Sequence, residues 1–294
     1  MANRRRHVVA ELTYEPVDRW IRGYLHPYRA PEAAGQGSAV VDSRAPLIVW
    51  EPRRFLPYYA FPEVDVRTDL LVPSATPPPE EPHGADTQFY DLRAPTETIP
   101  HAAWRWPDPQ LAGHLAFDWE ALDHWFQEDD EVIGHLRDPY HRVDLLPTSR
   151  VIRVELDGKV LAVSDRTLAM PETLLPTRYY FDPADVDTDL LTHSPLTTVC
   201  PYKGVASYWA VSTGSDPEPG RELAWTYPRP FPGVDAAAGR IAFLGELLDI
   251  TVDGVPQRRP NTQWSAGIRP NHRGGGSGHA QGAHAGADLS ILSR

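Results

Sequence analysis

The sequence predicts a mainly β protein built from two tandem β-rich domains, with one short helix at the end of the first. Its 294 residues include 31 Pro, 9 Trp and 12 Tyr. Proline breaks helix interiors, whereas aromatic side chains favour pleated sheets. Short runs that alternate apolar and polar residues end at Pro, Gly, Asp or Ser, as strands and turns do. The third observation is that the chain repeats itself.

The repeat is visible in three matched segments that follow one another in the same order. They are "YYAFPEVDVRTDLL" (58–71) with "RYYFDPADVDTDLL" (178–191), "WRWPDP" (104–109) with "WTYPRP" (225–230), and "AGHLAF" (112–117) with "AGRIAF" (238–243). Such spacing predicts a tandem duplication. We place the first repeat at 15–145, the second at 146–262, and a disordered Gly- and His-rich tail at 263–294.

Upstream segments extend the alignment of the two repeats. "RWIRGYL" corresponds to "RVIRVEL", and "DSRAPLIVWE" to "SDRTLAMPET", which leaves Glu51 one position out of register with Glu172. In "VIRVELDGKVLAVS" the pair Asp157-Gly158 tolerates positive φ and predicts a two-residue hairpin turn. Shorter strands are expected at "RYYF", "SYWAVS", "LAWTYP", "GRIAFL" and "LLDITV".

The helix is predicted in "DWEALDHWFQEDDEVI" (118–133). Trp119, Leu122 and Phe126 recur at helical spacing, and Asp118 is a suitable N-cap. We find no counterpart of this helix in the second repeat. The following segment, "GHLRDPYHRVDLLPTSR", is interpreted as the connection between the repeats.

Charge and composition narrow the classes of partner. A formal net charge of -12 repels phosphate backbones, so no nucleic-acid partner is expected. The start of the chain lacks a signal-peptide apolar run, and no apolar stretch is long enough to span a membrane, which predicts a cytoplasmic protein with no membrane partner. One cysteine excludes an internal disulfide. No cofactor or metal is expected.

Three strings of the second repeat resemble one family. They are "VIRVELDGKVLAVSDRTLAMPETLLPTRYYFDPADV", "TTVCPYKGVASYWAV" and "AWTYPRP". Residues 15–262 resemble the family called domain of unknown function 427, in its tandem actinobacterial-type form, which is sometimes labelled a putative nucleotidyltransferase. The resemblance implies small β-rich domains akin to β-tent folds. It does not imply an established activity.

The repeats differ where the chemistry of a site would be expected. Tyr58 replaces Arg178, and "PPPEEPHGAD" replaces "CPYKG" (200–204), so the first repeat lacks the thiol, the lysine and the arginine. The second repeat is therefore the expected location of a site. The first is expected to act as a scaffold, or to form one wall of a shared cleft.

Cys200 is a candidate nucleophile. Pro201 and Gly204 permit a tight loop whose amides, with Lys203, could stabilise a thiolate. The alternative is a small buried apolar residue. His193, seven residues upstream, leaves a Cys/His pair open.

Lys203 and Arg178 are candidate anion-binding residues, since an ammonium and a planar guanidinium suit a carboxylate or phosphate. The alternative is an ion pair, for example of Arg178 with Asp185 or Glu172. Glu172 itself is a candidate general acid or base, or a structural hydrogen-bonding group.

Aromatic and acidic residues complete the candidate site. Tyr179 has a counterpart in the first repeat, which favours the core, although it also lies beside the candidate arginine. Tyr202, Tyr208 and Trp209 flank the special loop, so a role in stacking on a ligand is open for them. The acidic string "DVDTD" (185–189) is interpreted as a turn and the start of a strand rather than a magnesium site, which leaves the nucleotidyltransferase label weak.

Together these residues predict that the second repeat binds or modifies a small anionic molecule in a cleft. As an enzyme, the protein would use Cys200 or Glu172 for the chemistry, with Lys203 and Arg178 orienting the substrate and Gly204 shaping the loop. As a binding module, the same loop would capture a ligand without turnover. A third alternative is an interaction protein with a proline-rich, aromatic docking surface.

Overall fold

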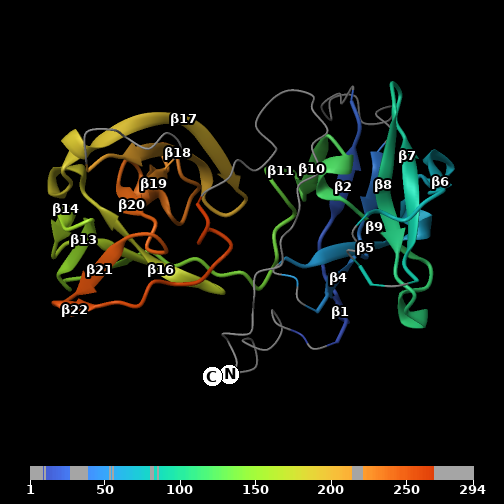
Figure 1. Ribbon diagram of the computed structural model, residues 1–294. Coiled ribbons are helices and arrows are strands. Elements are labelled where there is room, and N and C mark those ends of the chain that lie inside the picture. The colour runs from blue at the N-terminus through green and yellow to red at the C-terminus, as the bar shows by residue number, and fades with distance from the viewer. Residues whose placement is uncertain are drawn as a thin grey trace. The chain divides into compact units, whose positions relative to one another are not determined.

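The computed structural model describes residues 9, 11–26, 39–52, 54, 56–79, 83, 84, 86–213 and 221–267. The predicted tail therefore lies outside the described residues from position 268 on. The chain divides into two compact units, Met1–Asp138 and Pro139–Arg294. Strands dominate both units, and every helix among the described residues is a three-residue 3-10 turn (Figure 1). The mainly β prediction is confirmed, and none of these turns is long or apolar enough to cross a membrane.

The first unit consists of a seven-stranded and a four-stranded antiparallel sheet. The larger sheet has the order β1 (Thr13–Pro16), β4 (Leu47–Trp50), β5 (Tyr58–Pro62), β9 (His114–Phe117), β8 (Thr98–Arg105), β7 (Gln88–Arg93) and β6 (Leu71–Pro73). The smaller sheet has the order β11 (Asp130–Val132), β10 (His124–Gln127), β2 (Ile21–Tyr24) and β3 (Ala39–Ser43). Among the described residues, the 3-10 turns of the first unit are η3 (Glu63–Asp65), η4 (Thr68–Leu70), η5 (Pro109–Leu111) and η6 (Trp119–Ala121).

The second unit repeats this plan strand for strand. Its larger sheet has the order β12 (Leu146–Pro147), β15 (Leu168–Glu172), β16 (Leu175–Phe181), β20 (Ile241–Phe243), β19 (Glu222–Thr226), β18 (Gly204–Val211) and β17 (Leu191–Cys200). Its smaller sheet has the order β14 (Lys159–Ser164), β13 (Ile152–Leu156), β21 (Asp249–Val252) and β22 (Val255–Pro256). Among the described residues, the 3-10 turns of the second unit are η7 (Pro183–Asp185), η8 (Thr188–Leu190) and η9 (Asp235–Ala237).

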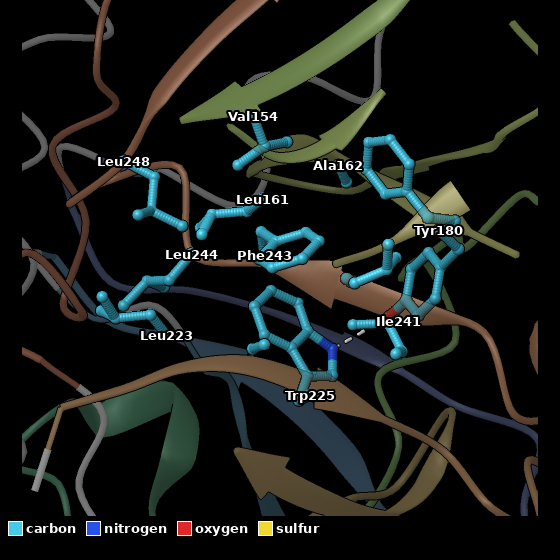
Figure 2. Packing of buried hydrophobic residues seen from close by; sticks show 14 of the residues in the cluster. Val154, Leu161, Ala162, Tyr180, Leu223, Trp225, Ile241, Phe243, Leu244 and Leu248 are labelled. Carbon is cyan, nitrogen blue, oxygen red and sulfur yellow. Dashed lines mark hydrogen bonds between the residues drawn. The ribbon is translucent and has the colours of Figure 1, made fainter. Parts of the chain in front are cut away.

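The hydrophobic core of the second unit draws on both of its sheets. Along β13 the burial alternates, so Ile152, Val154 and Leu156 point inward. Figure 2 shows Val154 of the smaller sheet near Phe243 and other buried residues of the larger one, with the Trp225 indole donating to the Tyr180 hydroxyl. The hairpin predicted at Asp157-Gly158 joins β13 to β14, with φ of 51° and 78° at its two central residues.

The helix predicted over 118–133 is wrong. Asp118 does cap a helical turn, accepting from the Glu120 amide at 3.1 Å, but this turn ends at Ala121. The chain then forms β10 and β11, and β10 buries Trp125, Phe126 and Gln127 in succession. Consecutive buried residues are typical of a strand covered on both faces, whereas a surface helix buries only one stripe.

This β10–β11 hairpin has a counterpart in the second unit, contrary to the prediction. β10 pairs with β2 and β11, just as β21 pairs with β13 and β22. The two hairpin turns also agree in backbone conformation, since φ is 53° at Glu128 and 52° at Asp253.

Strand pairing also corrects the alignment around the two acidic residues. Leu47 pairs with Ala60, and Leu168 pairs with Tyr180, so β4 matches β15 at an offset of 121 residues, the difference between 168 and 47. Glu51 directly follows β4 and Glu172 ends β15, which places both at the same position. Glu51 is therefore the direct counterpart of Glu172.

Candidate functional site

The "CPYKG" segment is the turn between β17 and β18. Cys200 pairs with Gly204, and the Lys203 amide donates to the Cys200 carbonyl at 3.3 Å. The Lys203 carbonyl in turn accepts from the Phe231 amide at 3.1 Å, which ties the turn to the loop after β19. Gly204 has φ of +105°, and a Cβ there would lie 3.1 Å from the Arg229 carbonyl oxygen. The turn therefore requires glycine at this position.

This turn directs Lys203 into the protein, where its Nζ donates to Oε2 of Glu172. The side chains of Lys203 and Glu172 are only 10% and 5% exposed. Glu172 reaches this position as the last residue of β15, which lies in the same sheet as β18 and is separated from it by β16, β20 and β19. Two candidate residues from distant parts of the second repeat thus form one buried ion pair.

A histidine that sequence reasoning missed completes the cluster. Nε2 of His141 lies 3.0 Å from Oε1 of Glu172, and the His141 ring stacks on Tyr202 with centroids 4.0 Å apart. The segment after His141 runs beside the end of β15, because the Thr173 amide donates to the Arg142 carbonyl at 2.9 Å and Val143 forms a bridge to Glu172. The supposed connection between the repeats is therefore part of the site.

The ion pair stays charged over the neutral pH range. Burial alone would raise the pKa of Glu172, but Lys203 and His141 outweigh it and lower the pKa to about 2. Burial likewise opposes the charge on Lys203, yet the negative groups around it, Glu172 among them, raise its pKa. A carboxylate fixed in its ionised form can hold a neighbouring imidazole in one orientation and stabilise its protonated state.

Cys200 is half-buried beside Lys203, and its surroundings do not lower the pKa of its thiol. Burial, together with the Glu172 carboxylate, raises the pKa of the thiol more than the Lys203 ammonium and the Tyr202 and Lys203 amides lower it. The loop geometry expected for thiolate stabilisation is thus present, but Lys203 is already paired with Glu172. His193 lies seven residues away along the extended β17, roughly 23 Å, and packs edge-on against Trp209. It forms no Cys/His pair.

Arg178 forms a separate buried ion pair. Its guanidinium donates in a bidentate manner to Glu246, at 2.7 and 2.5 Å, and Thr262 donates to the same carboxylate at 2.7 Å. Trp225 and Trp264 flank the guanidinium at 5.6 and 5.8 Å. The partner of Arg178 is therefore neither Asp185 nor Glu172. Its charge is compensated inside the protein, which makes it a positioning group for the surrounding chain.

Strand alternation separates the remaining candidates. Tyr180 lies on the inner face with Arg178. Burial raises the pKa of Tyr180 to about 12, and Lys203 and Arg178 partly oppose that rise. Tyr179 is on the opposite face, where Arg150 lies 5.6 Å from its ring. In the same way Trp209 faces away from the inward side of the strand on which the buried Tyr208 lies. The structure thus brings together Glu172, Cys200, Tyr202, Lys203 and Gly204.

Asp185 has a structural role. Arg166 and Ser164 bind its carboxylate and lower its pKa to about 2. Ser43 and Asp65 form the equivalent hydrogen bond at 2.7 Å in the first repeat, as expected of a turn that the fold requires. Within the described ranges no group of three or more His, Cys, Asp or Glu residues is placed to hold a metal ion.

A hollow of about 190 Å³ lies elsewhere in the second unit. It is lined by Arg221, Glu222, Leu223, Leu247, Ser265, Ala266 and Gly267. None of the residues of the Lys203 cluster contributes to it. Leu247 and Ser265 do connect it to the segments that carry Glu246 and Thr262, the partners of Arg178.

Comparison with known proteins adds one finding. A family model described as domain of unknown function (DUF427), whose short name carries a nucleotidyltransferase label, matches twice, at residues 28–128 and 144–254. The two matches fall in the two structural repeats. No curated protein matches the chain.

Proposed function

Since the chain belongs to the DUF427 family in a tandem form, we propose that its second repeat binds a small anionic molecule at His141, Glu172 and Lys203. Proton exchange between His141 and the ligand is part of this proposal. The family description assigns no reaction, so the proposal rests on the site itself.

The orientation of His141 is the observation that supports this proposal. Glu172 holds Nε2, while Nδ1 has no hydrogen-bond partner among the described residues. The Glu172 carboxylate and the Lys203 ammonium cancel, so a protonated His141 leaves the cluster with one net positive charge. An anion at Nδ1 would be bound by that charge, so anion binding and protonation of the imidazole favour each other.

Capture of a ligand is favoured over covalent catalysis. A nucleophilic cysteine needs a depressed pKa, and burial raises the pKa of Cys200. The site offers an oriented imidazole and a buried ion pair, which suit ligand binding and proton transfer. The proposal therefore also covers a binding module, which would bind the anion without converting it.

Isothermal titration calorimetry with inorganic phosphate and acetate tests the proposal, in two buffers that differ in ionisation enthalpy. We expect anion binding to be coupled to proton uptake, which the dependence of the binding enthalpy on the buffer reports. His141→Gln removes this uptake. Lys159→Met is the matched control, because Lys159 is exposed and is the only lysine besides Lys203. Absence of binding, or proton uptake that His141→Gln leaves unchanged, would contradict the proposal.

A further inference from the structure

We propose that the first repeat holds a second anion-binding site, in which Glu51 orients His83 and Nε2 of His83 contacts the ligand. The sequence alone predicts that this repeat is a scaffold or one wall of a shared cleft, because it lacks the "CPYKG" segment. The proposal extends the chemistry of the proposed function to other residues, and it stands on contacts of the first repeat alone.

Glu51 is buried and fully engaged by donors. Its carboxylate accepts from the Trp106 indole at 2.6 Å and from Nδ1 of His83 at 2.8 Å, and the Arg54 guanidinium lies 3.1 Å away. The side chains of Glu51 and His83 are each 5% exposed. The carboxylate is thus shared by a permanent cation and an imidazole, as Glu172 is shared by Lys203 and His141.

His83 occupies the place in the fold that Lys203 occupies in the second repeat. Its loop joins β6 to β7, which correspond to β17 and β18 in the order of the two larger sheets. Both loops therefore deliver a nitrogen to a carboxylate at the end of the matching strand. The first repeat thus has the same carboxylate as the second, with a histidine where the second has the lysine.

The His83 ring is held rigidly by aromatic neighbours. It stacks on Trp104 with centroids 3.8 Å apart and an interplanar angle of 12°, and Tyr58 meets it edge-on at 5.2 Å. Tyr58 stands at the position that Arg178 occupies in the second repeat, so a tyrosine contacts the His83 ring where the second repeat has the arginine. With Nδ1 on Glu51, Nε2 has no hydrogen-bond partner among the described residues.

The charged groups and the burial around His83 determine its protonation state. The titratable groups that face it are Glu51, Arg54, Asp118 and Tyr58. Burial lowers the pKa of His83 more than Glu51 raises it, which makes the neutral imidazole the resting form near pH 7. An anion at Nε2 would be accompanied by one proton from solvent, or a weak acid would give its proton to Nε2 and remain as the conjugate base. Glu51 stabilises the imidazolium in either case.

Carbethoxylation of the full chain by diethyl pyrocarbonate, mapped by peptide mass spectrometry, tests this site. The reagent needs an unprotonated imidazole nitrogen that it can reach. We expect His83 to react in the folded protein and inorganic phosphate or acetate to protect it. Protection should reach about tenfold when the anion is at ten times its Kd, because it follows 1 + [L]/Kd. The exposed His193 is the internal reference and should not be protected.

Glu51→Gln should abolish the protection of His83 and leave the reaction of His193 unchanged. Reaction of His83 only in denaturant, or at a rate that neither anion changes between pH 5.5 and 7.5, would overturn the inference. His141 is mapped in the same spectra. If the anions protect His141 but not His83 in the unsubstituted protein, this site is rejected and the proposed function is retained. If they protect His83 but not His141, the proposed function is rejected and this site is retained.

Discussion

Glu51 and Glu172 lie at the same position of the two repeats, and each is buried against a nitrogen supplied by the same loop of the fold. The nitrogen belongs to His83 in the first repeat and to Lys203 in the second. Each carboxylate also binds a group from elsewhere, Trp106 in one case and His141 in the other. Both repeats thus hold a buried negative charge, and different groups compensate it in each. The stability of each repeat should depend on that compensation.

Lys203→Met should destabilise the second repeat strongly. The substitution leaves Glu172 buried without its cation, which typically costs about 3–5 kcal/mol. The double variant Lys203→Met/Glu172→Gln should recover much of this loss, because it removes both charges. Urea unfolding measures the effect, with Lys159→Met as the control of equal chemistry at an exposed site. Equal costs for the two lysines would contradict the buried ion pair.

The ion pair should also shape the acid limb of the stability profile. The pKa of Glu172 falls from an ordinary 4.5 to about 2 on folding. A depressed carboxyl pKa contributes stability that is present above the unfolded pKa and is lost as pH falls towards the folded one. The contribution is about 3 kcal/mol at neutral pH. We expect it to disappear between about pH 5 and pH 2.

Urea unfolding at a series of pH values measures this limb. Subtracting the profile of the Lys203→Met/Glu172→Gln variant isolates the contribution of Glu172 from that of other carboxyl groups. Parallel profiles for the two proteins would show that Glu172 does not titrate abnormally.

Gly204→Ala should cost more than Gly158→Ala. Both glycines have positive φ, at +105° and +78°, but only Gly204 has a backbone oxygen close to the added Cβ, whereas nothing lies within 4 Å at Gly158. We expect about 1 kcal/mol for the turn at Gly158 and about 2–3 kcal/mol for Gly204, where strain and contact add. Denaturation midpoints compare the two. Because the contact is with the loop that anchors Lys203, Gly204→Ala should also weaken anion binding, and Gly158→Ala should not.

The sequence was informative wherever a structural feature depends on neighbouring residues. Asp157-Gly158 specifies its hairpin through positive φ, and the alternation in β13 specifies which side chains enter the core. Pro201 and Gly204 likewise permit the tight loop that the structure shows at "CPYKG". These features are local, so a short window contains the cause.

The errors arose where the cause is distant. Trp119 and Leu122 have a spacing that fits a helix, yet they enter the core from a 3-10 turn and the residue that follows it, because β2 pairs with the next segment. His141 was missed because it precedes the second repeat in sequence and reaches Glu172 only through pairing beside β15. The one sequence signal that could have pointed to His141 is a carboxylate predicted to be buried, because a buried charge requires compensating partners.

Cys200 should be a slow nucleophile in the folded protein. Burial raises the pKa of its thiol, and Lys203 partly opposes that rise. We therefore expect iodoacetamide to alkylate Cys200 at pH 8 much more slowly in the folded chain than in urea. Lys203→Met should slow the reaction further, because it removes the cation that favours the thiolate. Mass spectrometry follows the reaction at this single cysteine, and Lys159→Met should leave its rate unchanged. A folded-state rate above that of the unfolded chain would mean that the turn amides and Lys203 dominate over burial, and it would return the covalent mechanism to consideration.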